Sequence, residues 1–449
     1  MKKKILFLGV GGIGVSALAL AAKKLGASVT GYDTKPSKLT QKLESHQIDI
    51  VSDIDNIDAT DFDMVVYSSA IPLHNSVLAQ ARHDGIPILQ RAMFLAELMK
   101  DFSKNIAVTG THGKTTTSSI LASLLYKLDS TSSFVVGGMV KATNTNIETR
   151  GTGTLVLEAD ESDASFLYLE PEVAIVTNID LDHMSTYKNS YDVLLENFYA
   201  FLSKECVETI IVCIDDKGCR DLLSKYDFSN KNIIRYGFST DADIRVSNYE
   251  VKDSQSTFDI NGQSFSTKLP GKYNVLNAVA SIISCKELGL DTVSIANELS
   301  NVAGVSRRFD IHNITINNIN VDVIDDYGHH PVEVSSCLQA VRDRYSDKEI
   351  THIFQPHRYS RNRDLFADWK KVLPSSDKLL LLPTYSAGED EIVGFTSEDM
   401  AKGLTNCELV ANLESAKQKL KSIINQKSVV LVQGAGDVTN LIELLQNDK

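Results

Sequence analysis

The sequence lacks the features that would place it in a membrane or outside the cell. No apolar run approaches the roughly 18 residues that are needed to span a bilayer. The apolar stretch Ile5–Leu8 is soon interrupted by glycines, and no small-residue cleavage site follows, as a signal peptide would require. Cysteine is scarce too, and the six cysteines form no Cys-x-x-Cys pair and match no zinc-site spacing. We therefore expect reduced thiols and a cytoplasmic location.

Positive charge is also in short supply. Lysine and arginine number 45 against 58 acidic residues, which gives a formal net charge of −13. General binders of nucleic acid or of anionic membranes need a basic face, so we expect neither kind of partner. An acidic protein can still have a local basic pocket, so binding of a small phosphate ligand stays possible. At about 150 residues per domain, the 449 residues predict three domains that need no disulfide or metal to hold their cores.

Strand and helix patterns alternate along most of the chain, which is typical of α/β domains with parallel sheets covered by helices. One stretch, residues 243–267, alternates polar and apolar residues around an Asn261-Gly262 turn and predicts antiparallel hairpins. A polar segment before residue 106 and the arginines at 307–308 indicate boundaries, giving domains of residues 1–103, 104–305 and 306–449. The predicted strands are Lys4–Leu8, Ser28–Tyr32, Met64–Tyr67, Ile86–Ile88, Ile106–Thr109, Leu155–Leu157, Val173–Thr177, Thr209–Cys213, Val321–Ile324, Ile350–Phe354, Lys378–Leu382 and Val429–Val432, and the clearest helices are Val15–Leu25 and Asn274–Leu288.

The first candidate binding motif is Gly9–Gly14, which fits Gly-x-Gly-x-x-Gly directly after a predicted strand and opens a predicted helix. Glycines at these positions let the backbone approach a pyrophosphate, whose charge then meets the N-terminus of the helix. Asp33 ends the second strand, about where a ribose-binding acid is expected. The motif predicts a diphosphate ligand but fits NAD, FAD or a UDP-sugar equally, and tight strand–helix packing alone is the alternative.

A second glycine loop, Gly110–Thr117, follows another strand and opens another helix. It departs from Gly-x-x-x-x-Gly-Lys-Ser/Thr because Val108 stands at the first glycine position. Gly113, Lys114 and Thr115 still provide the amides, the phosphate-binding lysine and the Mg²⁺-binding hydroxyl of a phosphate loop. We expect Lys114 to be exposed on this loop.

Polar side chains gather where other buried strands end. Residues 158–163 and 178–183 follow two strands near the second glycine loop, and their oxygen ligands suit Mg²⁺, although each acid alone is more simply a solvated loop residue. Residues 325–331 and 355–361 follow strands of the third domain in the same way. Arg358 and a second arginine, three residues further on, could together bind one carboxylate. The alternative is that each is a surface residue that forms an ion pair with an acidic side chain.

Together, the motifs at residues 110–117, 158–166, 178–187, 274–278, 325–331 and 357–361 resemble those of the Mur ligases of peptidoglycan synthesis, in the same order and over essentially the whole chain. The resemblance implies an N-terminal Rossmann-like domain for a UDP-sugar, a central P-loop ATPase-type domain with a parallel or mixed sheet, and a C-terminal Rossmann-like domain for an amino acid. It also implies an ATP-dependent ligase that joins L-alanine to the lactyl carboxylate of UDP-N-acetylmuramate through an acyl phosphate, giving ADP and phosphate.

The resemblance further implies roles for individual residues. The UDP-sugar would be bound by Gly11, Gly12, Ile13, Gly14, Asp33 and Ser69. ATP would be bound by Gly110, Thr111, His112, Gly113, Lys114, Thr115, Thr116, Asn274, Asn277, Arg308 and Asp326. Two Mg²⁺ ions would be held by Thr115, Glu158 and His183, and the amino acid by Tyr327, His329, Arg358 and Arg361. The catalytic residues would be Lys114, Glu158, His183, Arg308 and His329, the last as the base for the amine.

Three other interpretations stay open on the sequence. A murein-peptide ligase would attach a ready-made peptide to the same UDP-sugar, although residues 327–328 and 357–359 favour the amino-acid enzyme. A folate polyglutamate ligase shares the central domain but lacks the first glycine loop. A nucleotide-binding regulator would keep the loops without catalysis, against which the full set of catalytic side chains argues. We expect a monomer or a weak homodimer.

Overall fold

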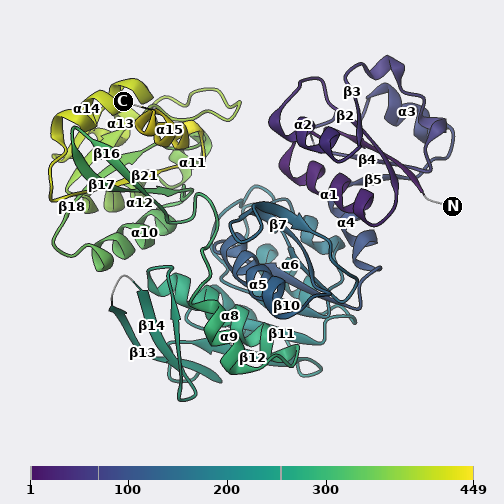
Figure 1. Cartoon of the computed structure of the whole chain (residues 1–449), viewed down its shortest axis with the longest axis horizontal. Helices are drawn as coiled ribbons and strands as arrows, with labels where there is room; N and C mark the ends of the chain where they lie inside the picture. Colours follow the sequence, from purple (N-terminus) through teal and green to yellow (C-terminus); the bar gives the residue numbers. More distant parts are fainter. Residues whose placement is uncertain (1–2, 69, 253–254, 448–449) are drawn as a thin grey trace. The chain divides into compact units, whose positions relative to one another are not determined.

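The computed structural model describes residues 3–68, 70–252 and 255–447 (Figure 1). Within these ranges the strands form three sheets. The chain divides into two compact units, which are described separately below. The first unit comprises Met1–Ser247, Ile260–Gln263 and Leu276–Val302, and the second comprises Asn248–Asp259, Ser264–Val275 and Ala303–Lys449.

The first hundred residues form a five-stranded parallel sheet with helices. Its elements are β1 (Lys4–Leu8), α1 (Ile13–Lys24), β2 (Ser28–Tyr32), α2 (Lys38–Ser45), β3 (Asp49–Val51), β4 (Met64–Tyr67), α3 (Ser76–His83), β5 (Ile88–Gln90) and α4 (Arg91–Met99). The strand order is β3-β2-β1-β4-β5, and every neighbouring pair is parallel. The order reverses between β1 and β4, so the first glycine loop, after β1, opens at a switch point, where open α/β sheets bind ligands.

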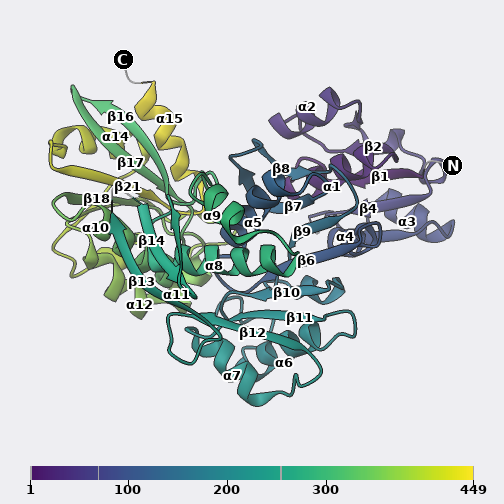
Figure 2. The ribbon, with the colours of Figure 1, turned by 60° about the horizontal axis from the view of Figure 1, so that its bottom comes forward.

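The middle of the chain contributes a ten-stranded sheet. Its elements are β6 (Lys104–Thr109), α5 (Lys114–Leu128), β7 (Ser133–Val140), β8 (Thr145–Glu148), β9 (Thr154–Glu158), β10 (Val173–Val176), α6 (Tyr191–Leu202), β11 (Thr209–Cys213), α7 (Lys217–Lys225), β12 (Asn232–Gly237), β13 (Ile244–Lys252), β14 (Gln255–Ile260), β15 (Gln263–Thr267), α8 (Lys272–Glu287) and α9 (Thr292–Leu299). The order is β15-β14-β13-β12-β11-β10-β6-β9-β7-β8. Around β10–β12, α6 and α7 lie on one side of the strands and α5 and α8 on the other (Figure 2).

The central strand of this sheet positions the second glycine loop. β6 is parallel to both β9 and β10, so the loops that follow these three strands emerge at one edge of the sheet. The predicted hairpin is confirmed for β14 and β15, which are joined by Asn261 and Gly262 with φ angles of 50° and 79°. Two consecutive residues with positive φ are typical of a tight hairpin turn.

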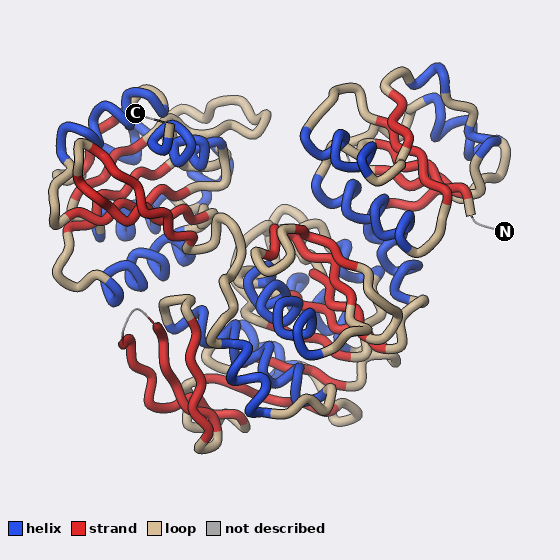
Figure 3. Tube along the Cα trace, in the orientation of Figure 1, coloured by secondary structure: helices blue, strands red, loops and turns tan. Residues whose placement is uncertain are grey.

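The last part of the chain forms a six-stranded sheet. Its elements are β16 (Asp310–Ile316), β17 (Ile319–Asp326), α10 (Pro331–Arg344), β18 (Glu349–Phe354), α11 (Tyr359–Asp364), α12 (Phe366–Val372), β19 (Lys378–Leu381), α13 (Ser397–Ala401), β20 (Cys407–Leu409), α14 (Leu413–Ile423), β21 (Ser428–Gln433) and α15 (Asn440–Gln446). In the order β16-β17-β21-β18-β19-β20, only the β16–β17 pair is antiparallel. Helices cover both faces of this sheet (Figure 3), one core holding α10 and α12, with the single tryptophan Trp369, and the other holding α14 and α15.

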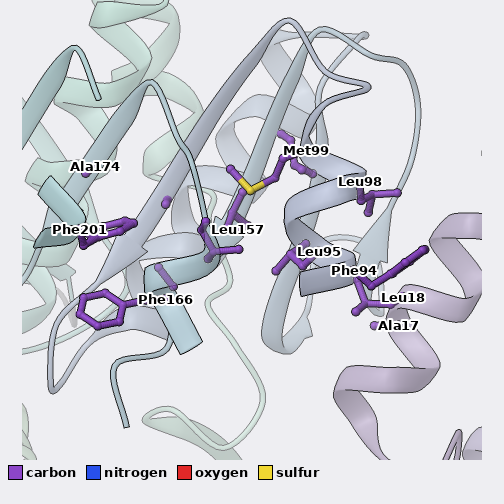
Figure 4. Packing of buried hydrophobic residues seen from close by; sticks show 14 of the residues in the cluster. Ala17, Leu18, Phe94, Leu95, Leu98, Met99, Leu157, Phe166, Ala174 and Phe201 are labelled. Atoms are coloured by element: carbon purple, nitrogen blue, oxygen red, sulfur yellow. The ribbon is translucent and has the colours of Figure 1, made fainter. Parts of the chain in front are cut away.

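One apolar cluster runs through the first unit from the first sheet into the middle one. Phe94 of α4 meets Phe7 of β1 edge-on, with ring centroids 5.2 Å apart, and the same cluster continues to the fully buried Phe166. The side chains of α4 lie between Leu18 of α1 and Leu157 of β9 (Figure 4). The helix α4 therefore packs against both sheets.

The predicted fold class is confirmed: the chain is α/β, with one fully parallel sheet and two mixed ones. The strands β3, β7, β8, β12, β16 and β20 were not predicted, and the domain boundaries at residues 104 and 306 stay predictions. All six cysteines carry free thiols. Among the described residues, no helix is both long and apolar enough to cross a membrane.

Candidate active site

The first glycine loop is held in place by Asp33. The Gly11 N–H donates to Oδ2 of this carboxylate at 2.7 Å, and the Lys35 N–H donates to Oδ1 at 3.2 Å. Asp33 thus orders the loop, and its predicted contact with a UDP-sugar stays a prediction, as do those of Gly12 and of Ile13, where α1 begins. Ser69, the remaining residue of this predicted site, lies outside the described residues.

Arg91 lies beside the same loop, and sequence reasoning missed it. A Cβ on Gly14 would fall 3.0 Å from both Cδ and Nη1 of Arg91, so the arginine side chain lies directly against this glycine. The arginine begins α4, 77 residues after Gly14, and no local pattern relates the two. It brings a positive charge to the N-terminus of α1, where the predicted diphosphate would lie.

The second glycine loop is bound tightly to the loop that follows β10. Gly110 has a φ of 126°, and a Cβ there would lie 2.2 Å from Thr177 Oγ1. The His112 N–H donates to Asn178 Oδ1 at 2.7 Å, and Asn178 Nδ2 donates back to His112 O at 2.8 Å. Gly113, with a φ of 84°, is the N-cap of α5 and supplies no side-chain cap. An uncapped helix N-terminus after a fixed glycine turn suits an anionic phosphate.

Lys114 is not exposed, contrary to the sequence-based expectation. Its side chain is only 15% exposed, and Nζ lies 2.7 Å from Oε2 of Glu161, which is itself buried. Nζ also donates to the carbonyls of Gly110 at 2.7 Å and Thr111 at 3.2 Å. The expectation failed because the loop that carries Glu161 follows β9 and meets the glycine loop at the same edge of the sheet.

These contacts set the charge states of the pair. Burial by itself lowers the pKa of Lys114, but the carboxylates of Glu161, Asp160 and Glu158 outweigh burial, and the net pKa is raised. Burial raises the pKa of Glu161 to about 7, and Lys114 limits that rise. Lys114 is therefore a firmly charged ammonium, whereas Glu161 is held close to its protonation point at neutral pH.

Thr115 and Glu158 together provide a set of oxygen ligands. Thr115 Oγ1 donates to Glu158 Oε2 at 3.3 Å. The other carboxylate oxygen, Oε1, accepts from Ser118 Oγ at 3.1 Å and from the Gly137 N–H at 2.8 Å, which fixes its direction. A carboxylate and a hydroxyl side by side at a phosphate loop are the donor types that Mg²⁺ prefers, so these residues fit the ion.

The loop after β10 carries the remaining predicted residues of this site. His183 has a φ of 55°, and its Nε2 lies 3.5 Å from Asp182 Oδ2. Thr111 Oγ1 accepts from the Asp180 N–H at 2.8 Å, so this loop also supports the glycine loop. The metal role of His183 stays a prediction.

Asn277 of α8 lies against the second glycine loop and the start of α5. Asn277 Oδ1 accepts from Thr117 Oγ1 at 3.1 Å and lies 2.7 Å from the position that a Cβ on Gly113 would take. Asn274 Nδ2 donates to Pro270 O at 2.8 Å, and Thr116 is buried on α5. The predicted contacts of Asn274 and Asn277 with adenine, and of Thr116 with ATP, stay predictions.

In the second unit, aromatic rings and an arginine gather where β17 and β18 end. His329 lies 5.3 Å from the ring of Tyr327 and 5.7 Å from that of His357, between centroids. Arg361 is buried, with Nη1 3.5 Å from His357 Nδ1. The ring of Tyr385 stacks on His357 at 5.6 Å. The structure therefore brings together three of the four residues predicted to bind an amino acid.

Arg358, the fourth, begins α11 as its N-cap and has a φ of 70°. Its Nη1 lies 4.0 Å from Oε1 of Glu389, and Ser360 donates to the same carboxylate from N and Oγ. His357 lies in the same motif, residues 355–361, that pointed to the two arginines, so the sequence offered a signal for it. Tyr385 and Glu389 lie more than twenty residues away in sequence, and no motif pointed to them.

His329 is a neutral imidazole at physiological pH. Burial lowers the pKa of His329 to about 3, opposed by the carboxylate of Glu333, whose Oε2 lies 3.6 Å from Nδ1. Nδ1 lies 3.2 Å from Tyr327 O, which assigns the proton of the neutral ring to Nδ1 and leaves Nε2 as an acceptor. So low a pKa makes His329 a weak base, and its predicted role stays a prediction.

Arg308 and Asp326 are both engaged within the second unit. The Asp326 carboxylate accepts from the N–H groups of Phe309 and Gly328, at 3.0 and 2.9 Å, and from Gln433 Nε2 at 2.7 Å. The Arg308 guanidinium lies 4.8 Å from the centroid of the Tyr327 ring. Their predicted contacts with ATP stay predictions.

A phosphate loop with a lysine, a hydroxyl and a fixed carboxylate at the carboxyl ends of parallel strands defines an α/β nucleotide-binding enzyme. The chain matches the family descriptions "Mur ligase family, catalytic domain" over residues 4–103, "Mur ligase middle domain" over 108–285 and "Mur ligase, glutamate ligase domain" over 307–436. It belongs to the Mur ligase family.

Relatives that match over the full length of the chain show which Mur ligases it resembles. The UDP-N-acetylmuramate–L-alanine ligases of Francisella tularensis subsp. novicida and Francisella philomiragia are each 58% identical to this chain, covering 99% of it and 100% of each relative. The crystal structure of the UDP-N-acetylmuramate–alanine ligase of Thermotoga maritima superposes with a TM-score of 0.80 at 29% identity, with full coverage of both chains. A murein peptide ligase from Psychrobacter arcticus shares the fold, with a TM-score of 0.67 at 20% identity over 100% of this chain and 99% of that one.

Proposed function

We propose that this chain is an ATP-dependent ligase that joins L-alanine to the lactyl carboxylate of UDP-N-acetylmuramate, giving ADP and phosphate, in peptidoglycan precursor synthesis. The observation that carries the proposal is the 58% identity over whole chains to ligases of that activity. The alternative, a murein-peptide ligase, is not favoured, because the structural relative with that activity is less similar in both sequence and fold.

The first half of the reaction is assigned to the second glycine loop. A carboxylate and an amine do not condense in water, so an oxygen of the lactyl carboxylate first attacks the γ-phosphorus of ATP, and the bond to ADP breaks. Lys114 and the amides at the start of α5 stabilise the charge on the transferring phosphoryl group. Thr115 and Glu158 would hold Mg²⁺, with His183 as the predicted ligand of a second ion. The bound metal neutralises phosphate charge.

The second half is assigned to the residues at the ends of β17 and β18. The neutral amine of L-alanine attacks the acyl carbonyl, the amide bond forms, phosphate leaves, and the amine gives up a proton. Arg358 and Arg361 would bind the carboxylate of L-alanine, and the Nε2 lone pair of His329 would accept from its amine. We further propose a cytoplasmic enzyme that acts as a monomer or a weak homodimer.

The experiment that tests this function is a phosphate-release assay with the full-length chain, ATP and Mg²⁺. Release should require both UDP-N-acetylmuramate and L-alanine, and a screen of the twenty amino acids should rank L-alanine first. Release with a ready-made peptide but not with L-alanine would favour the murein-peptide ligase instead.

A further inference from the structure

The contacts of Lys114 raise a question that the proposed reaction leaves open. The Lys114 ammonium is engaged at three places within the protein: Nζ donates hydrogen bonds to the carbonyls of Gly110 and Thr111 and forms a close ion pair with Glu161. A phosphate that binds Lys114 must therefore compete with these protein groups for Nζ.

Of the three partners, Glu161 is the one that opposes ATP most directly. It carries the same sign of charge as a phosphate and makes the ion pair with Nζ at 2.7 Å. The main chain of Glu161 is fixed, because its carbonyl accepts from the Ala164 N–H at 3.0 Å and from the hydroxyl of the buried Tyr187. The carboxylate can therefore follow Lys114 only as far as its own side chain reaches, and the ion pair must lengthen or break when Nζ moves to a ligand.

We propose that Glu161 is a positioning residue that holds Lys114 folded back onto its own loop until ATP displaces it. The proposal rests on the proposed function, since ATP is taken as the ligand. Both carboxylate oxygens of Glu161 are buried and neither has a hydrogen-bond partner among the described residues, so Glu161 has no hydrogen bond to replace its ion pair with Lys114. When Lys114 leaves, the carboxyl group takes up a proton, which its pKa of about 7 allows near neutral pH.

The test is the affinity of the full-length enzyme for the β,γ-imido analogue of ATP with Mg²⁺, measured by calorimetry. In the variant Glu161→Gln (E161Q), which keeps the shape but not the charge, Lys114 no longer gives up an ion pair on binding. Giving up a buried ion pair costs binding affinity, so we expect the variant to bind the analogue about 10-fold more tightly than the wild type. In turnover, the KM for ATP should fall without a rise in kcat.

Two controls separate this mechanism from simpler ones. Removing a negative charge near a phosphate could tighten binding without involving Lys114, and that effect would persist in a Lys114→Met background. The proposal predicts no gain from E161Q in that background. Glu172→Gln removes another carboxylate of the first unit, one that accepts from the Asn105 N–H at 2.6 Å, and should leave the affinity unchanged.

The outcomes are distinct. Equal or weaker binding by E161Q, or an equal gain in the Lys114→Met background, would overturn the proposal. If E161Q does not fold, Glu161→Asp, which keeps the charge but lengthens the pair, should bind more tightly than the wild type by a smaller factor, and affinity at or below the wild-type value would overturn the proposal. Failure of the wild type to bind the analogue at all would count against the proposed function itself.

Discussion

His352 gives a prediction about stability that does not depend on the catalytic proposal. It lies on β18 in the second unit with no exposed surface, and burial lowers the pKa of His352 to about 3, from 6.5 for an ordinary histidine. The folded protein therefore keeps this ring neutral over a range of pH in which the unfolded chain protonates it. Above pH 6.5 the two states bind the same number of protons at this site, and as pH falls from 6.5 toward 3 the unfolded state gains one.

The size of the effect follows from this proton difference. Each pH unit in that window costs the folded state about 1.4 kcal/mol per proton, so His352 removes about 2.5 kcal/mol of unfolding free energy between pH 7 and pH 4.5. In His352→Leu, which preserves an apolar buried side chain, this loss should disappear. The variant should therefore be less sensitive to acid than the wild type, whatever its stability at pH 7.

The assay is urea unfolding at pH 7, 5.5 and 4.5, followed by tryptophan fluorescence. The only tryptophan, Trp369, is buried in the second unit, with its ring 5.0 Å from Phe354, which in turn lies 5.4 Å from His352. Buried histidines elsewhere in this unit are present in both proteins and cancel in the comparison. His312→Gln, at a partly exposed position on β16, is the matched control. An unchanged dependence of unfolding free energy on pH in His352→Leu would refute the reasoning.

Three further predictions concern activity. Lys114→Ala should lower turnover by roughly 10³-fold or more and also destabilise the first unit, because it leaves Glu161 buried without its partner; near-normal turnover would remove the phosphate-loop assignment. Glu158→Ala and His183→Ala should each lower kcat by about 100-fold if both hold Mg²⁺, and full activity of both at low millimolar Mg²⁺ would contradict the metal assignment. Arg361→Ala should raise the KM for L-alanine by roughly 10- to 100-fold and leave the KM for UDP-N-acetylmuramate near the wild-type value. An unchanged KM for L-alanine in single variants of both Arg358 and Arg361 would show that neither arginine binds the amino acid.

The elements that were predicted well are those whose signal is local. The predicted strands Lys4–Leu8, Met64–Tyr67 and Thr209–Cys213 have the observed bounds, because parallel strands buried on both faces are largely continuous apolar segments. The strand β7 was missed, since it contains two adjacent glycines and its partner β8 is antiparallel. Whether β7 forms a strand depends on the strands that pair with it rather than on its own residues.

In the candidate site, too, local motifs were predicted and contacts between distant residues were not. Gly113, Lys114 and Thr115 were found because a phosphate loop is one contiguous motif followed by a helix. The burial of Lys114 was not found, because its partner Glu161 lies 47 residues further along and reaches it only through the order of β6 and β9. Distant pairs of this kind depend on strand order, which the sequence does not state.

The apolar cluster that runs from α1 through α4 to Phe166 bears on how this protein can be divided or recombined. Cutting the chain between α4 and β6 would uncover Leu98, Met99 and Leu157 to water, and an isolated first hundred residues should aggregate rather than fold. Exchanging that segment with a relative would succeed only if the residues that face α4 were transplanted as well. The two glycine-loop parts of the first unit thus share one apolar core, although each carries its own predicted ligand motif.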